Sequence, residues 1–286
     1  MIATRSPLIW MGGKAKLAVE IISRMPDHKV YVELFGGAAH VMAQKSPSAH
    51  EIYNDIDGHL VNFLLVARAD PEKLRQACET LPYSRWLYET WRDEWKAGKW
   101  PADPFERAVR WFYLNRSAIA KGNSPKNKNT GWRHSTTSKE NPARSYQTAC
   151  QRIESFAKRM RPVLIENLDF RKVIEKYDSP DTLFYCDPPY FDCEHYYMGE
   201  FSERDHRDLA EMLKQIKGKA IVSYYDHPMV YRLYDGWRIE TFDTHKQVIT
   251  NKSTADNRAR EVLLMNYDLQ MSLFEFASGG EVSGTA

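Results

Sequence analysis

Residues 182–191 read "TLFYCDPPYF" and join a strand-like apolar segment to a turn that contains two prolines. Prolines lack the N–H group that a sheet ladder needs, so we expect the strand to end where they begin. They also stiffen the turn, which would fix Asp187 and Tyr190 at the edge of the predicted sheet. A carboxylate and a flat aromatic ring held in set positions indicate a binding or catalytic site.

Strand-like and helix-like segments alternate along the chain around this stretch. The predicted strands are short segments rich in β-branched and aromatic residues, at 29–34, 51–55, 162–167, 182–186 and 220–225. The segments between them carry apolar residues at three-to-four spacing, which predicts helices. This alternation predicts an α/β fold with a mostly parallel sheet. Two last strand-like segments, 237–244 and 261–267, flank a polar loop and fit an antiparallel pair.

The pattern changes between residues 70 and 146. That region holds Trp-rich helical segments and a loop rich in Gly, Asn, Ser and Lys. We therefore predict a catalytic domain in two parts, 1–69 and 147–269, with an inserted helical subdomain at 70–146 that carries a basic loop. The tail 270–286 is rich in small and polar residues and is predicted to be disordered.

Composition indicates a globular cytoplasmic protein. No run approaches the roughly 18 apolar residues of a membrane span, and the amino terminus lacks the apolar core of a signal peptide. The four cysteines have no metal-ligand spacing and are interpreted as reduced thiols, with disulfides or zinc as the alternative. Net charge is only +2, yet 116–144 holds seven Lys or Arg against the single acid Glu140. This local excess indicates a polyanionic partner; a solvated loop is the alternative.

Two glycine pairs and one acid stand where α/β sheets bind ligands. Gly36 and Gly37 follow a strand, so backbone there approaches a ligand closely, unless the pair serves only the turn. Asp55 ends the next strand, a position that commonly accepts hydrogen bonds from ribose hydroxyls or else caps a helix. An earlier Gly-Gly turn precedes Lys14, but Ala15 follows that lysine, so the segment does not fit a P-loop.

Taken in order, these motifs resemble those of the Dam-type DNA adenine methyltransferases. The matching segments are "WMGGK" (10–14), "ELFGGAAHV" (33–41), "YNDID" (53–57), "YLNR" (113–116), "NLDF" (167–170), "LFYCDPPY" (183–190), "FSERDHRDLAEML" (201–213) and "EVLLMNY" (261–267). The resemblance implies a class I S-adenosylmethionine-dependent methyltransferase fold, which is Rossmann-like, with a helical DNA-recognition insertion. It implies methylation of adenine N6 in double-stranded DNA.

The DPPY segment suits that chemistry. Adenine's exocyclic amine is a poor nucleophile, because its lone pair is delocalised into the ring. If Asp187 and the carbonyl of Pro188 each accept one amine N–H, the lone pair is turned toward the sulfonium methyl group. Asp187 would also offset the positive charge that develops on nitrogen. Tyr190 would stack on an adenine extruded from the duplex.

The resemblance also assigns a set of cofactor contacts, residue by residue. Lys14 would lie near the methionine carboxylate, Asp55 would hold the ribose hydroxyls, and Asp169 with Phe170 would hold the adenine ring. The complete predicted set is Trp10, Lys14, Glu33, Phe35, Gly36, Gly37, Asp55, Asp169, Phe170 and Asp187. No metal is implied, since methyl transfer from a sulfonium needs no Lewis acid.

Two rival functions remain open at this point. Cytosine N4 methyltransferases usually carry Ser where this chain has Asp187, which favours adenine. Cytosine C5 enzymes attack through the thiolate of a Pro-Cys motif that is absent here, so Cys186 is interpreted as a packed core thiol. A DNA-binding relative without catalysis is the second rival, against which the presence of Lys14, Asp55, Asp187 and Tyr190 argues.

DNA recognition and further partners are less specified. The segment after residue 116 departs from the pattern of GATC-specific relatives, so no target sequence is assigned. The predicted DNA contacts are Arg116, Lys121, Asn123, Lys126, Lys128 and Arg133. The segment "QMSLF" (270–274) resembles the peptide that binds the bacterial sliding clamp, through Gln270, Leu273 and Phe274; packing of the last two on the core is the alternative. A restriction-modification system, a phage or a regulatory pathway would each fit.

Overall fold

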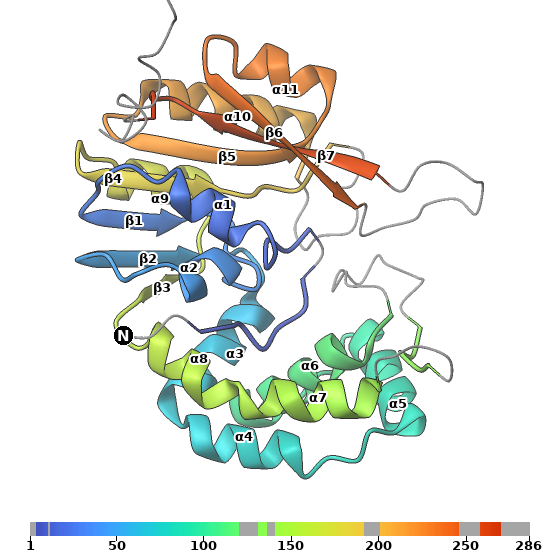
Figure 1. Cartoon of the computed structure of the whole chain (residues 1–286). Helices are drawn as coiled ribbons and strands as arrows, with labels where there is room; N and C mark the ends of the chain where they lie inside the picture. The colour runs from blue at the N-terminus through green and yellow to red at the C-terminus, as the bar shows by residue number, and fades with distance from the viewer. Residues whose placement is uncertain are drawn as a thin grey trace, which may run out of the picture.

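A seven-stranded sheet lies at the centre of the computed structural model (Figure 1). The structure describes residues 4–10, 12–119, 131–135, 141–191, 201–245 and 258–269. The strands lie side by side in the order β3-β2-β1-β4-β5-β7-β6. Along the chain they are β1 (Val30–Glu33), β2 (His50–Asn54), β3 (Leu164–Glu166), β4 (Thr182–Cys186), β5 (Lys219–Tyr225), β6 (Arg238–His245) and β7 (Arg258–Met265).

Strands β1 to β5 run parallel, and β7 runs antiparallel between β5 and β6. The predicted α/β fold is therefore confirmed, including its antiparallel final pair. The chain builds the sheet outward from β1 to β3 and then returns to place β4 and β5 on the other side of β1. Connections consequently leave the carboxyl ends of β1 and β4 in opposite directions, which opens a crevice where proteins of this class bind ligands.

Helices cover both faces of the sheet, and the side chains of a strand alternate between them. Along β4, Leu183 and Tyr185 join one core, whereas Phe184 and Cys186 join the other. The first core also takes side chains from α1 (Ala18–Ser23), α2 (His40–Gln44) and α3 (Gly58–Ala69); the second takes them from α9 (Phe170–Tyr177), α10 (Glu203–Gln215) and α11 (Pro228–Leu233). Burial and the adjacent charge of Asp187 raise the pKa of the Cys186 thiol, which disfavours the thiolate. This fits the interpretation of Cys186 as a packed core residue.

Five more helices form a layer below the sheet in the view of Figure 1. They are α4 (Pro71–Glu79), α5 (Arg85–Lys96), α6 (Pro104–Ser117), α7 (Pro142–Gln151) and α8 (Ile153–Met160). The side chains of Asp70, Ser84, Asp103 and Asn141 accept hydrogen bonds from first-turn N–H groups and so fix four of the helix starts. Helix α7 runs across residue 146, and the division into 1–69, 70–146 and 147–269 stays a prediction.

Three sequence expectations concern metals, cysteines and membranes. Within the described ranges, Cys78, Cys150 and Cys186 are buried thiols without a disulfide, and Cys193 lies outside them. The same ranges contain no group of three or more His, Cys, Asp or Glu side chains that could hold a metal ion. None of the described helices is both long and apolar enough to span a bilayer.

A buried ionic cluster joins the helical layer to the sheet. Glu51 on β2 accepts hydrogen bonds from Lys45 at 2.7 Å and from both terminal nitrogens of Arg159 on α8, at 2.6 and 2.8 Å. Burial alone would raise the pKa of Glu51, but the two cations outweigh it and lower that pKa. Removing one partner of such a cluster leaves an uncompensated buried charge, which costs more than the pair contributes.

Glu51→Gln should therefore lower the free energy of unfolding by about 3 kcal/mol, because two buried cations lose the carboxylate that they share. Urea denaturation followed by circular dichroism measures this. Glu154→Gln is the matched control, since Glu154 is exposed and pairs with Arg75 at the surface. Its cost should stay below about 1 kcal/mol. Equal losses for the two variants would contradict a structural role for the Glu51 cluster.

Candidate active site

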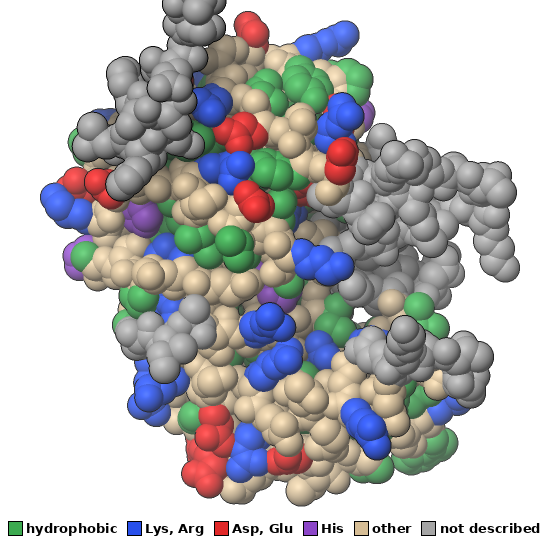
Figure 2. All heavy atoms as spheres, viewed as in Figure 1, with side chains coloured by type: hydrophobic (Ala, Val, Ile, Leu, Met, Phe, Trp, Pro, Cys, Tyr) green, Lys and Arg blue, Asp and Glu red, His purple; other side chains and the backbone are tan. Residues whose placement is uncertain are grey.

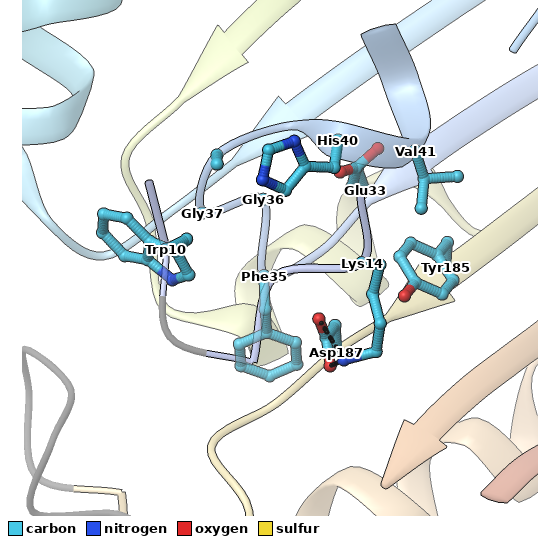
Figure 3. Close-up of a pocket in the computed structure, with 12 residues that line it drawn as sticks. Trp10, Lys14, Glu33, Phe35, Gly36, Gly37, His40, Val41, Tyr185 and Asp187 are labelled. Carbon is cyan, nitrogen blue, oxygen red and sulfur yellow. Dashed lines mark hydrogen bonds and ion pairs between the residues drawn. The ribbon is translucent and has the colours of Figure 1, made fainter. Parts of the chain in front are cut away.

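A pocket opens at the carboxyl ends of β1 and β4, where the strand order reverses (Figure 3). Its lining residues come from the segment before α1, the end of β1 with the turn that follows it, the start of α2 and the end of β4. They are Trp10, Gly13, Lys14, Glu33, Phe35, Gly36, Gly37, Ala38, His40, Val41, Tyr185 and Asp187. Seven of the predicted cofactor contacts are thus brought together: Trp10, Lys14, Glu33, Phe35, Gly36, Gly37 and Asp187.

Glycine is required at both positions of the turn after β1. A Cβ atom on Gly36 would lie 2.0 Å from the ring of Tyr53, and one on Gly37 would lie 2.7 Å from the ring of Trp10. Gly37 also has a φ of +48°, a backbone conformation that disfavours side chains. The hydroxyl of Tyr53 donates to the carbonyl oxygen of Gly37 at 2.6 Å. The pair therefore leaves room for two aromatic rings and lets the backbone of this turn line the pocket.

Lys14 lies at the centre of a buried polar cluster beside the pocket. Its ammonium nitrogen is 2.7 and 2.9 Å from the two carboxylate oxygens of Asp187 and 3.0 Å from Oε1 of Glu261 on β7. It also donates to the carbonyl oxygen of Gly12 at 2.7 Å and to the hydroxyl oxygen of Tyr190. The Tyr190 hydroxyl in turn lies 2.6 Å from Oε1 of Glu261 and 3.0 Å from Oδ1 of Asp187.

The charges in this cluster support one another. Burial alone would lower the pKa of Lys14, but the carboxylates of Asp187 and Glu261 outweigh it and raise that pKa, so Lys14 stays protonated. Burial also raises the pKa of Glu261, assisted by the like charge of Asp187 and opposed by Lys14. Only Asp187 is partly open: 19% of its side chain is exposed, against 5% for Lys14. The exposed acceptor in the cluster is therefore Asp187.

Strand β5 supplies one more contact to Asp187. The hydroxyl of Ser223 donates to Oδ1 of Asp187 at 2.9 Å and lies 3.2 Å from the hydroxyl of Tyr185. Oδ1 thus has several donors around it, whereas among the described residues Oδ2 accepts only from Lys14. Asp187 is held in one orientation, and Oδ2 retains the greater capacity to accept another hydrogen bond.

Comparison with known proteins decides the family. The model of the D12 class N6 adenine-specific DNA methyltransferases matches residues 10–250, a span that includes the pocket and the DPPY turn. The chain belongs to this family. It is thus an adenine-specific DNA methyltransferase with DNA as its substrate, and the family implies S-adenosylmethionine as the methyl donor. The resemblance and the enzyme class inferred from the sequence are confirmed.

Several bacterial DNA adenine methylases are similar over most of the chain. The protein from Haemophilus influenzae is 24% identical over 266 residues, which cover 85% of this chain and 87% of the relative. One from Vibrio cholerae is 24% identical over 280 residues, covering 91% and 95%. The protein from Escherichia coli K12 is 23% identical over 271 residues, covering 89% and 92%. The similarity therefore includes the helical layer as well as the sheet.

Glu33 and Asp55, two predicted cofactor contacts of this methyltransferase, face protein groups. Glu33 accepts hydrogen bonds from the Met42 amide at 2.9 Å and the Tyr31 hydroxyl at 3.1 Å, and burial raises its pKa to about 8. Asp55 is buried and accepts from the amides of Gly37 and of residue 57, both at 2.8 Å. Asp55 thus fixes the glycine turn, and a ribose contact by either acid stays a prediction.

The predicted adenine-ring residues lie at the start of α9. Asp169 caps that helix by accepting from the amide of Arg171 at 2.9 Å, and it also forms an ion pair with the Arg171 side chain at 3.1 Å. Phe170 packs on Phe35, with ring centroids 5.7 Å apart, and Phe201 lies 5.7 and 5.8 Å from those two rings. Phe201 therefore forms one aromatic group with Phe170 and with Phe35, which lines the pocket.

Most of the predicted DNA contacts lie outside the described residues, namely Lys121, Asn123, Lys126 and Lys128. Arg116 donates to the backbone and hydroxyl oxygens of Ser145 on α7, at 3.2 and 3.1 Å. The amide of Arg133 donates to the carbonyl of Ser117, beside a bridge between Ala118 and Trp132. In the view of Figure 2, Lys and Arg side chains lie across the middle of the molecule, between the sheet and the helices below it.

Sequence reasoning missed Ser223 and Glu261. Both lie in strands that are otherwise apolar, "AIVSYY" and "EVLLMNY". A polar residue at a position buried within a sheet has to be satisfied by a partner, and this is the signal that marks them. Their contacts, Ser223 with Asp187 and Glu261 with Lys14, are not evident from the order of the chain. They depend on the pairing of β5 with β4 and β7.

Gly36→Ala should prevent the turn after β1 from closing, because the added Cβ lies 2.0 Å from Tyr53. We expect a loss of about 2 kcal/mol or more in unfolding free energy together with loss of S-adenosylmethionine binding, measured by thermal denaturation and calorimetry. Gly58→Ala is the control, since its nearest neighbour would be 3.7 Å away, and alanine favours the helix start. Wild-type binding by Gly36→Ala would refute the need for glycine.

Ser223→Ala should lower kcat about tenfold, because Asp187 loses a neutral donor that orients its carboxylate. The melting temperature should change little. Ser155→Ala, at an exposed position on α8, serves as the control and should keep the wild-type rate. Methylation of duplex DNA at saturating substrates measures both variants. A wild-type kcat for Ser223→Ala would show that Asp187 is oriented without this hydroxyl.

Proposed function

We propose that this protein transfers a methyl group from S-adenosylmethionine to N6 of an adenine in double-stranded DNA, with Asp187 as the acceptor for the amine. Family membership supplies the adenine-specific activity. The observation that carries the finer proposal is the partly exposed carboxylate of Asp187 at the switch point of the sheet, beside the pocket and next to buried Lys14.

The pocket residues suit the cofactor. Gly36 and Gly37 line the pocket without side chains, Trp10 and Phe35 offer apolar surface, and Lys14 offers a cation for a carboxylate. Bound S-adenosylmethionine supplies an electrophilic methyl group on a cationic sulfur. The protein's part is to bind that ligand beside Asp187 and to exclude water, which strengthens each electrostatic contact inside.

Asp187 and the Pro188 carbonyl would then hold the two hydrogens of the adenine amine. The rigid turn and the Ser223 hydroxyl keep the Asp187 carboxylate in place, so it is preorganised for the charge that develops on nitrogen. Lys14 has to release part of its hold on Asp187 as the amine approaches, since it contacts both oxygens. Release of Lys14 toward the cofactor carboxylate fits its predicted role.

The ring of Tyr190 is buried, whereas stacking on a base requires an exposed ring face. Its side chain is only 2% exposed, its hydroxyl belongs to the Lys14 cluster, and its ring meets that of Tyr225 edge-on at 4.4 Å. Stacking on an extruded adenine would require a face of this ring to become exposed first. Base extrusion and stacking by Tyr190 therefore stay predictions.

Four other predictions rest on sequence alone. Cytosine N4 methylation and a non-catalytic DNA-binding role compete with the adenine reaction, although the family match favours adenine. Clamp binding through Gln270, Leu273 and Phe274 concerns residues outside the described ranges. A role in restriction-modification, rather than in a phage or a regulatory pathway, is equally a prediction.

Asp187→Ala should lower the rate of N6-methyladenine formation at least about a hundredfold, because the main acceptor of the amine is removed. Mass spectrometry of nucleosides from methylated duplex DNA measures the product. Asp226→Asn is the control: this acid follows the neighbouring strand β5, accepts a hydrogen bond from the Tyr231 hydroxyl at 2.9 Å and lies 3.7 Å from Arg260. An active Asp187→Ala enzyme would refute the mechanism, and N4-methylcytosine from the wild type would establish the cytosine alternative.

A further inference from the structure

Glu261 is a buried acid to which the family motifs assign no role. It lies on β7 opposite Tyr225 of β5 and Phe242 of β6, and only 4% of the residue is exposed. The matched family region ends at residue 250, before this strand. A carboxylate buried in a sheet costs free energy unless it is paired, and its partners here are Lys14 and Tyr190.

Lys14 has more acceptors around it than an ammonium can satisfy. Three N–H groups face oxygens from Gly12, Asp187, Tyr190 and Glu261, and Asp187 presents both of its oxygens. The distances to Asp187 (2.7 and 2.9 Å) and to Glu261 (3.0 Å) are nearly equal. The ammonium is therefore shared between two carboxylates.

With Asp187 and Glu261 both ionised, this sharing leaves the cluster with one more negative charge than positive. Burial and Asp187 raise the pKa of Glu261, whereas the Lys14 ammonium and the Tyr190 hydroxyl favour its ionised form. Asp187 and Glu261 face the single cation Lys14 among the described residues. Glu33 also lines the pocket, but burial raises its pKa and favours its neutral form. Without Glu261, the ammonium would pair with Asp187 alone and neutralise it. With Glu261 present, Asp187 keeps part of its charge for other hydrogen-bond donors.

We propose that Glu261 is a positioning residue that holds the Lys14 ammonium partly away from Asp187 and so keeps Asp187 able to accept the hydrogens of the adenine amine. The proposal rests on the proposed function, because it assumes that Asp187 receives the amine. Glu261 acts through Lys14 and Tyr190, and it does not line the pocket itself. The excess negative charge also favours a cationic ligand in the pocket over a neutral one of the same shape.

Two substitutions separate the charge of Glu261 from its shape. Glu261→Gln keeps the length of the side chain and removes the charge, whereas Glu261→Asp keeps the charge and shortens the side chain. Because Coulomb attraction falls only as the inverse of distance, Asp retains much of the pull on Lys14. A role in packing predicts that Gln is tolerated better than Asp. Positioning through charge predicts the reverse order.

The experiment measures kcat and KM on duplex DNA for the wild type, both Glu261 variants and the control Glu240→Gln. Glu240 lies on the adjacent strand β6 and pairs with two cations, Arg24 and Arg238, away from the pocket. We expect kcat of Glu261→Gln to fall about tenfold or more with KM for DNA nearly unchanged, Glu261→Asp to lie between it and the wild type, and the control to match the wild type.

Calorimetry gives a second readout that does not depend on turnover. Glu261→Gln should bind S-adenosylmethionine several-fold more weakly, while S-adenosylhomocysteine, which lacks the sulfonium charge, should bind as it does to the wild type. Equal losses for both ligands would indicate a damaged pocket and overturn the proposal. A wild-type kcat for Glu261→Gln, or a Gln variant more active than the Asp variant, would overturn it as well.

Thermal denaturation establishes that each variant folds. Should Glu261→Gln fail to fold, Glu261→Asp decides alone: a reduced kcat at a wild-type melting temperature, with weaker binding of S-adenosylmethionine but not of S-adenosylhomocysteine, supports the proposal, and an unchanged kcat refutes it. The activity of the wild type distinguishes a failure of this inference from a failure of the proposed function. If the wild type forms no N6-methyladenine, the proposed function fails; if it does and Glu261→Gln equals it, only the role of Glu261 fails.

Discussion

The ion pair between Lys14 and Asp187 joins two segments that are 173 residues apart in the chain. It forms at the carboxyl ends of β1 and β4, where the sheet order reverses and the backbone leaves a crevice. Two charges taken out of water are stable only when nearly all of their hydrogen-bonding capacity is met. Gly12, Tyr190, Ser223 and Glu261 meet that requirement here, so a shell of polar groups surrounds the pair beside the pocket.

The glycine turn after β1 is the second element on which the site depends. Gly36 leaves the space that the Tyr53 ring occupies, and the Tyr53 hydroxyl then holds the carbonyl of Gly37. Asp55 completes the turn from β2 by accepting the amide of Gly37. Neighbouring parallel strands thus shape one loop, which carries Phe35 and leaves room at Gly37 for Trp10, and both aromatic side chains line the pocket (Figure 3).

Much of the fold follows from local sequence, because alternating strands and helices leave few topologies. The association of Lys14, the glycine turn and Asp187 was also predictable, since each follows a strand or a Gly-Gly turn and the motifs occur in a family order. Ser223 and Glu261 were not, because their roles depend on strand pairing across the sheet. The orientation of Asp55 was not predictable either: its position at a strand end suits ribose or backbone amides equally, and its bonds to the amides of Gly37 and residue 57 depend on packing between β1 and β2.

Two buried ionic clusters in this molecule show how charge balance separates structure from function. In the first, one carboxylate, Glu51, meets the two cations Lys45 and Arg159, and its pKa is lowered. In the second, two carboxylates share the cation Lys14, and the pKa of Glu261 is raised. The first is suited to holding a helix against a sheet. The second retains negative charge that its own partners do not neutralise, at a cost in stability, and it lies where Asp187 reaches the pocket. An uncompensated charge of this kind is expected at a functional site rather than in a structural core.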